Sequence, residues 1–307
     1  MNTLAPVFLV IALGWTLTRG GFLSDQALRD LNRLAYWVGL PCLLFYRIAG
    51  ASPEIEAVSG LLIVGAGATL IGILAATIAA RALAVPPAVT GTFVQGAFRG
   101  NLTFVGLPLV VYALSGDGMS SAGAEASALL MFGPMVVLYN VLAVVVLLFF
   151  GGNRPSGVIR SAAGGLATNP ILIACVGGLL VALSGASLPV LAVRTLSAIG
   201  QMALPLALLC IGGTLYTSRV RGSLRWALVG AGMKVSLVPA AGYALAIWVG
   251  LSAEHMRIAL ILLACPTASA SYVLAGQLGG DLSLASSLIV ISNLLAVPAM
   301  VVVLLVS

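Results

Sequence analysis

Ten long apolar stretches constrain this chain more than any other feature of its sequence. A helix that crosses a bilayer needs about 20 largely apolar residues, and most of the stretches reach that length. They cover residues 3–19, 26–49, 59–82, 88–114, 124–150, 169–184, 189–217, 223–250, 255–278 and 282–306. Because these runs do not alternate apolar with polar residues, they are not typical of a membrane β-barrel. The sequence predicts an all-α polytopic membrane protein with ten transmembrane helices.

The composition excludes the soluble classes of protein. Only 7% of the residues are charged and 61% are hydrophobic, whereas a soluble domain carries about 25% charged residues. So few charges cannot cover a water-exposed surface, which argues against a cytosolic enzyme, a nucleic-acid binder and a secreted disulfide scaffold. The four cysteines lie in apolar runs without CxxC spacing, so we expect reduced packing residues. We expect no cofactor, no metal site and no nucleic-acid partner.

Basic residues predict the orientation in the bilayer. Nine of the 14 Lys and Arg residues lie in or beside the loops after the first, third, fifth, seventh and ninth stretches, and three lie on the opposite side. The positive-inside rule places the richer side in the cytoplasm. Both termini are then expected outside. The N-terminus lacks a basic leader, so we expect no signal peptide.

An internal repeat relates the two halves of the chain. A shift of 164 residues aligns Pro6 with Pro170, Pro41 with Pro205 and Pro134 with Pro298, against about 0.3 proline pairs expected by chance. Five predicted spans separate each residue from its mate, so the second half should be inverted relative to the first. Inverted repeats of this kind are typical of secondary transporters.

Two mated spans are interrupted in their middle. The fourth contains FRGNLTFVGLP, residues 98–108, and the ninth contains CPTASASY, residues 265–272. Proline removes a backbone donor and clashes with the preceding turn, and unsatisfied amides are tolerated in a bilayer only inside protein or along a wet cavity. We expect these segments to unwind and cross at mid-membrane. A pair of ordinary proline kinks is the simpler alternative.

Charges inside the spans favour an anionic ligand. Arg99 lies roughly 16–20 Å into its span at 1.5 Å per residue, and an ionisable residue at that depth suggests a functional site. Lys234 lies at a similar depth, where a functional role, a buried ion pair and a reach to the cytoplasmic headgroups all stay open. All eight acidic residues lie at span ends or in loops. Buried cations and half-helix N-termini together favour a carboxylate.

Neutral polar side chains complete the candidate site. Asn140 and Asn293 lie in the fifth and tenth spans, where hydrogen bonding between helices is the default role. Asn293 could also present its carbonyl to a small cation, as backbone carbonyls do in some transporters. Several glycines in the third span predict close helix packing.

At these residues the chain resembles the auxin efflux carrier family, in its bacterial branch. Arg99 and Asn101 followed by Gly106–Pro108 are similar to the family's fourth-span signature, and Pro266–Ala268 with Tyr272–Ala275 and Gly279–Asp281 to its ninth. The likeness covers the whole chain. The long central cytoplasmic loop of plant members is absent, and bacterial members often carry Ser or Thr where this chain has Asn293.

The resemblance implies a fold similar to that of bile-acid symporters and sodium–proton antiporters. It implies two inverted five-helix repeats, residues 1–150 and 169–307, joined by a cytoplasmic connection at 151–168. Spans 1, 2, 6 and 7 would form a scaffold domain, and spans 3–5 and 8–10 a transport domain. The broken spans 4 and 9 would cross at Asn101–Pro108 and Pro266–Ser271. Elevator motion and a homodimer through the scaffold are implied as well.

The sequence therefore predicts a secondary carrier for a small organic anion in the bacterial inner membrane, and no enzyme. The resemblance implies malate, malonate or auxin as substrate types. The expected substrate-binding residues are Arg99, Asn101, Thr103, Pro108, Asn140, Pro266, Thr267, Ser269 and Ser271. Arg99 would attract the carboxylate, and Pro108 and Pro266 would hold the helices open. The alternatives are a membrane-embedded ligand sensor, a cation-coupled symporter and, more weakly, a membrane enzyme.

Overall fold

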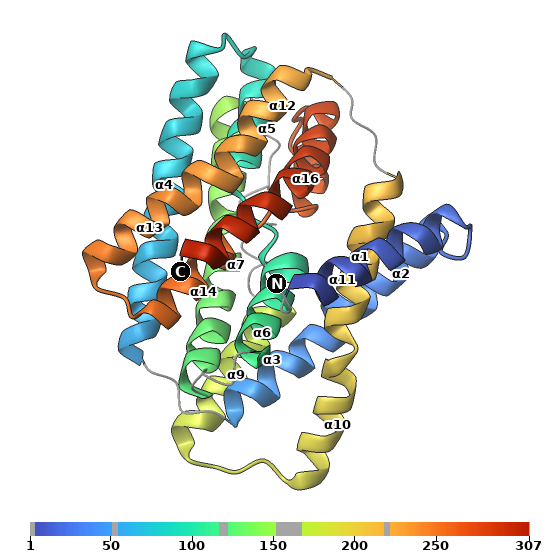
Figure 1. Ribbon diagram of the computed structural model, residues 1–307, viewed down its shortest axis with the longest axis vertical. Helices are drawn as coiled ribbons and strands as arrows, with labels where there is room; N and C mark the ends of the chain where they lie inside the picture. Colours follow the sequence, from blue (N-terminus) through green and yellow to red (C-terminus); the bar gives the residue numbers. More distant parts are fainter. Residues whose placement is uncertain (1–3, 51–54, 117–121, 152–167, 218–221, 307) are drawn as a thin grey trace. The chain divides into compact units, whose positions relative to one another are not determined.

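A computed structural model describes residues 4–50, 55–116, 122–151, 168–217 and 222–306, and this part of the chain is helical (Figure 1). Three short segments are π-helical: η1 (Ala35–Gly39), η2 (Leu102–Gly106) and η3 (Met233–Leu237). The α-helices are α1 (Leu4–Arg19), α2 (Asp25–Leu34), α3 (Leu40–Ala49), α4 (Ile55–Ala82), α5 (Pro87–Phe98), α6 (Leu107–Gly116), α7 (Ala122–Phe150), α9 (Pro170–Ser184), α10 (Val190–Gln201), α11 (Ala203–Thr217), α12 (Leu224–Gly232), α13 (Val238–Val249), α14 (Ala253–Leu263), α15 (Ala270–Gln277) and α16 (Leu282–Val306).

Five helical segments in the described residues are long and apolar enough to cross a membrane. They are Glu56–Ala82, Ala126–Phe150, Val190–Thr217, Leu224–Val249 and Leu282–Leu305. The multi-pass, all-helical prediction is thereby supported, but ten spans are not established. Of the other predicted spans, the first and sixth form helices of 16 and 15 residues, and the fourth and ninth are each split by a non-helical segment. The second is an unbroken helical run of α2, η1 and α3 that begins with charged residues.

The chain divides into two compact units. The first contains Met1–Val58, Thr103–Pro134 and Gly165–Ser218, and the second contains Ser59–Leu102, Met135–Gly164 and Arg219–Ser307. Each unit is assembled from segments that are distant in sequence. The predicted cytoplasmic connection at 151–168 lies outside the described residues, apart from its first and last residue.

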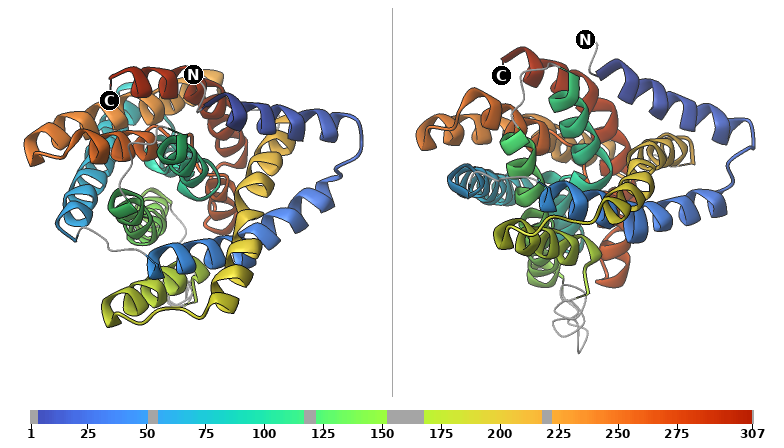
Figure 2. Two further views of the ribbon diagram at one scale, coloured as in Figure 1. Left: turned by 60° about the horizontal axis from the view of Figure 1, so that its bottom comes forward. Right: turned by 90° about the horizontal axis from the view of Figure 1, so that it is seen from below.

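Close helix contacts at glycines organise the first unit. α1 packs along α11, and α3 lies beside α9 in both views of Figure 2. A Cβ at Gly14 would collide with the backbone carbonyl of Leu209, and one at Gly178 would lie 2.9 Å from the carbonyl oxygen of Phe45. Only glycine allows the backbones to approach so closely, which is how small residues promote helix packing in membranes.

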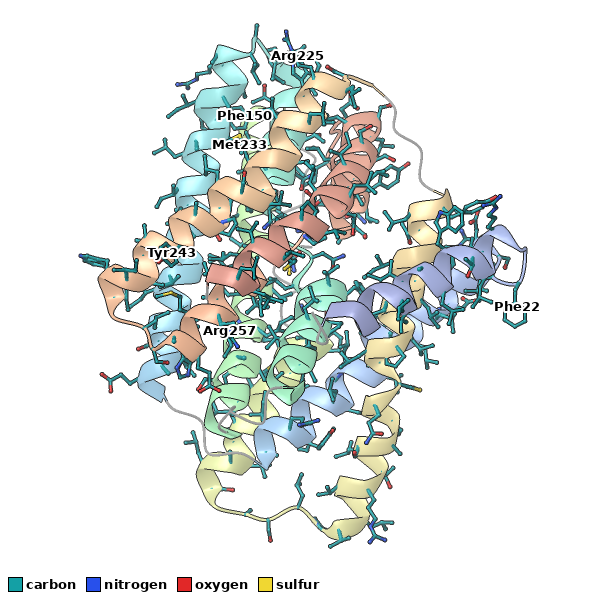
Figure 3. All side chains as sticks on the ribbon, viewed as in Figure 1. Phe22, Phe150, Arg225, Met233, Tyr243 and Arg257 are labelled. Carbon is teal, nitrogen blue, oxygen red and sulfur yellow. The ribbon has the colours of Figure 1, made fainter. Side chains whose placement is uncertain are left out.

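In the second unit, glycines of α4 lie close to side chains of α13 and of Leu251, which follows it, rather than to backbone atoms. A Cβ at Gly60, Gly67 or Gly72 would lie 2.7–2.9 Å from side chains of Leu251, Leu245 and Val238, respectively. The close packing predicted for the glycines of this span is therefore confirmed. α5, α12 and α16 pack against one another in the same unit. At one edge the Arg225 guanidinium donates to the Leu83 carbonyl at 3.0 Å (Figure 3), which ties α12 to the end of α4.

Candidate functional site

Two helices of the second unit end within the candidate site. α5 stops at Phe98, and Arg99 leaves the helix in an extended conformation with φ −75° and ψ 99°. α14 stops at Leu263, and the chain becomes helical again only with α15 at Ala270. Pro266 lies between them, so the position that predicted the break coincides with a real one.

The two interrupted segments bind each other through their backbones. Gly100 and Thr267 form an antiparallel β-bridge. The Asn101 amide donates to the Pro266 carbonyl at 2.7 Å, and the Ala268 amide donates to the Arg99 carbonyl at 2.9 Å. Groups that lost their helical partners at the breaks are thereby satisfied without water, which an apolar surrounding requires. The two predicted breaks are therefore real, and the interrupted segments pair with each other.

The predicted limits of the fourth-span crossover are wrong. The non-helical residues are Arg99–Asn101, whereas Leu102–Gly106 is π-helical and Pro108 is the second residue of α6. Pro108 therefore does not hold the helices open. Pro108 lies instead just after the π-helical turn, where a continuous helical run from Leu102 to Gly116 changes from π-helix to α-helix.

Thr267 fastens the crossover to its surroundings. Its side chain is fully buried, and its hydroxyl donates to the Gly96 carbonyl at 2.7 Å. Its backbone amide donates to the Ser292 hydroxyl at 2.9 Å, and that hydroxyl donates to the Ile289 carbonyl. Gly96 lies in the last turn of α5, where carbonyls lack helical donors. Thr267 therefore connects α5, the crossover and α16.

Arg99 is held by the crossover and by α7. Its side chain is 6% exposed, and its guanidinium donates to the side-chain oxygen of Asn140. Asn101 is also buried, at 3% exposure. The structure thus brings together Arg99, Asn101 and Asn140. Arg99 and Asn140 are 41 residues apart in sequence. A guanidinium offers five donors in a fixed planar geometry, a geometry that suits the two oxygens of a carboxylate.

Ser271 adds a polar group from α15. The backbone carbonyl of Ser271 accepts a hydrogen bond from the side-chain amide of Gln95 at 3.1 Å. The Ser271 hydroxyl and the Gln95 side-chain oxygen are buried and have no hydrogen-bond partner among the described residues. A buried polar atom without a partner costs free energy, so both groups are suited to contact a ligand. Ser269, half-buried, precedes the first residue of α15.

Three of the remaining candidate residues have other surroundings. Thr103 and Pro108 belong to segments of the first unit. The Asn293 amide donates to the Ile289 carbonyl at 2.8 Å, one turn earlier in α16. Among the described residues, no group of three or more His, Cys, Asp and Glu side chains could hold a metal ion.

Lys234 lies beside the crossover and was left undecided by the sequence. Its side chain is fully buried, and its ammonium donates to the Leu263 carbonyl at 2.5 Å. Of the alternatives left open for Lys234, a reach to the headgroups is therefore excluded. The sequence also missed Gly96 and Ser292 as partners of Thr267. Ser292 is a hydroxyl within an apolar span, but nothing local indicates which amide it accepts from.

Comparison with known proteins identifies the family of the chain. The family described as membrane transport protein matches residues 1–304. An uncharacterised transporter from Methanothermobacter thermautotrophicus is 24% identical over 300 residues, which cover 96% of this chain and 94% of the relative. An uncharacterised transporter from Methanocaldococcus jannaschii is 19% identical over 301 residues, which cover 95% of this chain and 94% of the relative. The chain therefore belongs to the membrane transport protein family, the auxin efflux carrier family that its signatures resemble.

Proposed function

We propose that this protein is a secondary transporter that moves a small organic anion, a mono- or dicarboxylate, across the cell membrane. The observation that carries the proposal is the buried Arg99 on a backbone crossover of two interrupted helices. Secondary transporters bind their substrates at such discontinuous helices near mid-membrane. Malate, malonate and auxin-like carboxylates are the first candidates.

The chemistry of the site supports an anion. Arg99 contributes a permanent positive charge within the protein, and its guanidinium donates to the side chain of Asn140. A carboxylate pairs with a guanidinium through charge-assisted hydrogen bonds, which are about twice as strong as neutral ones. The Ser271 hydroxyl, without a partner among the described residues, can donate to the same ligand. We place Asn101, Thr267 and Ser269 around it as well.

Two equivalent contacts support the inverted repeat. Gly14 packs on the backbone of Leu209, and Gly178 packs on the backbone of Phe45. A shift of 164 residues converts Gly14 into Gly178 and Phe45 into Leu209, so each contact is the mate of the other. A two-fold relation between the halves produces such paired contacts.

Residues on the repeat axis should meet their own mates. Gly39 and Ala203 are separated by the same 164 positions, and a Cβ at Gly39 would lie 2.9 Å from the Ala203 Cβ. We propose on these grounds two inverted five-helix halves. We further propose elevator-type alternating access, because the separation into two compact units is what such motion needs, and a homodimer in the inner membrane with both termini outside.

Transport by reconstituted protein tests the proposal. Proteoliposomes should accumulate labelled malonate, malate or indole acetate with time. Arg99→Ala should lower affinity for the transported anion about 10–100-fold, the effect of losing hydrogen bonds from a charged group. Arg194→Ala is the matched control, since Arg194 is exposed on α10. Binding without accumulation would identify a sensor, and full affinity in Arg99→Ala would show that the site lies elsewhere.

A further inference from the structure

Lys234 is a buried cation for which the proposed substrate contacts give no role. It lies in η3, the π-helical segment between α12 and α13 that begins at Met233, labelled in Figure 3. Its side chain is fully buried. Single π-helical turns within α-helices are frequent at functional sites. An ammonium in that position must have specific partners, because burying an isolated charge is very costly.

One partner is the end of α14. The Lys234 ammonium donates to the carbonyl of Leu263, the last residue of that helix, at 2.5 Å. Carbonyls in the last turn of a helix have no helical donors, and the helix dipole adds negative potential there. Lys234 therefore binds to the electronegative end of an interrupted helix.

The second partner is the other interrupted segment. A Cβ at Gly100 would lie 3.2 Å from Cε and 3.4 Å from Nζ of Lys234. The ammonium therefore lies against the backbone of the crossover, and the absence of a side chain at Gly100 gives it room. It contacts both segments of the β-bridge region, one at Leu263 and one at Gly100.

The other titratable side chains that we find near this ammonium are a cysteine and a tyrosine, which ordinarily carry no charge at neutral pH. The Cys265 thiol, on the same interrupted segment, donates to the Ile261 carbonyl. The Tyr139 ring of α7 lies against Gly100 as well, 3.5 Å from a Cβ there. No carboxylate within the described residues forms an ion pair with Lys234. Its charge is therefore balanced by backbone carbonyl dipoles.

We propose that Lys234 is a tethered cation that occupies the place of a coupling ion. In carriers with broken helices, carbonyls at half-helix C-termini coordinate Na⁺. Here the Leu263 carbonyl at such an end is already bound by the protein's own ammonium, and an ammonium can donate to three acceptors. Folding and substrate binding are therefore independent of Na⁺. The part of this inference that concerns substrate binding rests on the proposed transport function. The part that concerns folding does not.

Replacement of the tether by a free amine tests the inference. Lys234→Ala removes three carbons and the nitrogen, the atoms that propylammonium supplies. In detergent, Lys234→Ala should melt below wild type in choline chloride. Propylammonium at equal ionic strength should raise its Tm by at least about 3 °C, as a ligand that binds only the folded state does. The Tm of the wild-type protein should not change when propylammonium is added.

Two control variants separate charge from packing. Lys234→Met keeps the stem but fills the space, so propylammonium should not raise its Tm. Ser236→Ala changes an exposed residue of the same π-helical segment and should behave as wild type. An equal response of all variants to propylammonium, or no response of Lys234→Ala, would overturn the inference.

Wild-type protein provides a test that does not depend on any variant folding. Exchange of choline for Na⁺ should leave its Tm unchanged within about 1 °C, because no mobile cation binds the folded state. A Na⁺-specific rise of several degrees would contradict the inference. These readouts use no carboxylate. Failure of malonate transport would therefore count against the proposed function and leave this result standing.

Discussion

Replacement of Thr267 by valine removes one hydrogen bond at the centre of the crossover and little else. The Thr267 side chain is fully buried, and its hydroxyl is 2.7 Å from the Gly96 carbonyl. Valine has nearly the same shape, so packing is retained. The Gly96 carbonyl, in the last turn of α5, then loses its side-chain donor inside the protein. A buried acceptor left without a donor costs about 1–3 kcal/mol.

That cost converts into a measurable melting temperature. One kcal/mol lowers Tm by roughly 2–4 °C in proteins of 150–250 residues, so a cost of about 1–3 kcal/mol should make Thr267→Val melt roughly 2–12 °C below wild type. The assay is thermal unfolding of the purified protein in detergent. The transported anion should also stabilise this variant less than wild type, because the crossover that presents Arg99 is loosened.

Thr77→Val is the matched control for this prediction. Thr77 is half-buried in α4, and its hydroxyl donates at 2.8 Å to the carbonyl of Ile73, four residues earlier. That carbonyl also accepts the helical amide, so valine leaves no acceptor without a donor. Thr77→Val should therefore melt close to wild type. If Thr267→Val loses no more stability than Thr77→Val, the reasoning about the crossover is refuted.

Two further predictions address the first unit and the charge of the site. Gly14→Ala places a Cβ on the Leu209 carbonyl and should abolish the monodisperse peak in size-exclusion chromatography. Gly20→Ala, whose new Cβ would have its nearest contact at 3.4 Å, should keep that peak. A monodisperse peak for Gly14→Ala would contradict this prediction. Asn140→Asp gives Arg99 an anionic partner that competes with the carboxylate, and malonate affinity by calorimetry should fall at least about tenfold. Unchanged affinity would mean that this guanidinium does not contact the ligand.

Much of the molecule follows from local sequence properties. Long apolar runs predict membrane helices because the backbone must satisfy its own hydrogen bonds in lipid. Pro266 predicts the break after α14 because proline cannot donate within a helix. Arg99 was recognisable as a candidate site residue because a charge at that depth is costly without a purpose. Pro108 misled the prediction, since proline is also tolerated within a helical run, here just after the π-helical turn η2.

The pairings of the site depended on tertiary structure alone. These pairings join segments that are far apart in the chain. Thr267 lies opposite Gly100, Arg99 donates to Asn140, and Lys234 binds the end of α14. Local propensity and polarity restrict each segment to a helix or a break. They carry no information about register, because register is decided by how whole helices pack and which buried donors reach which acceptors.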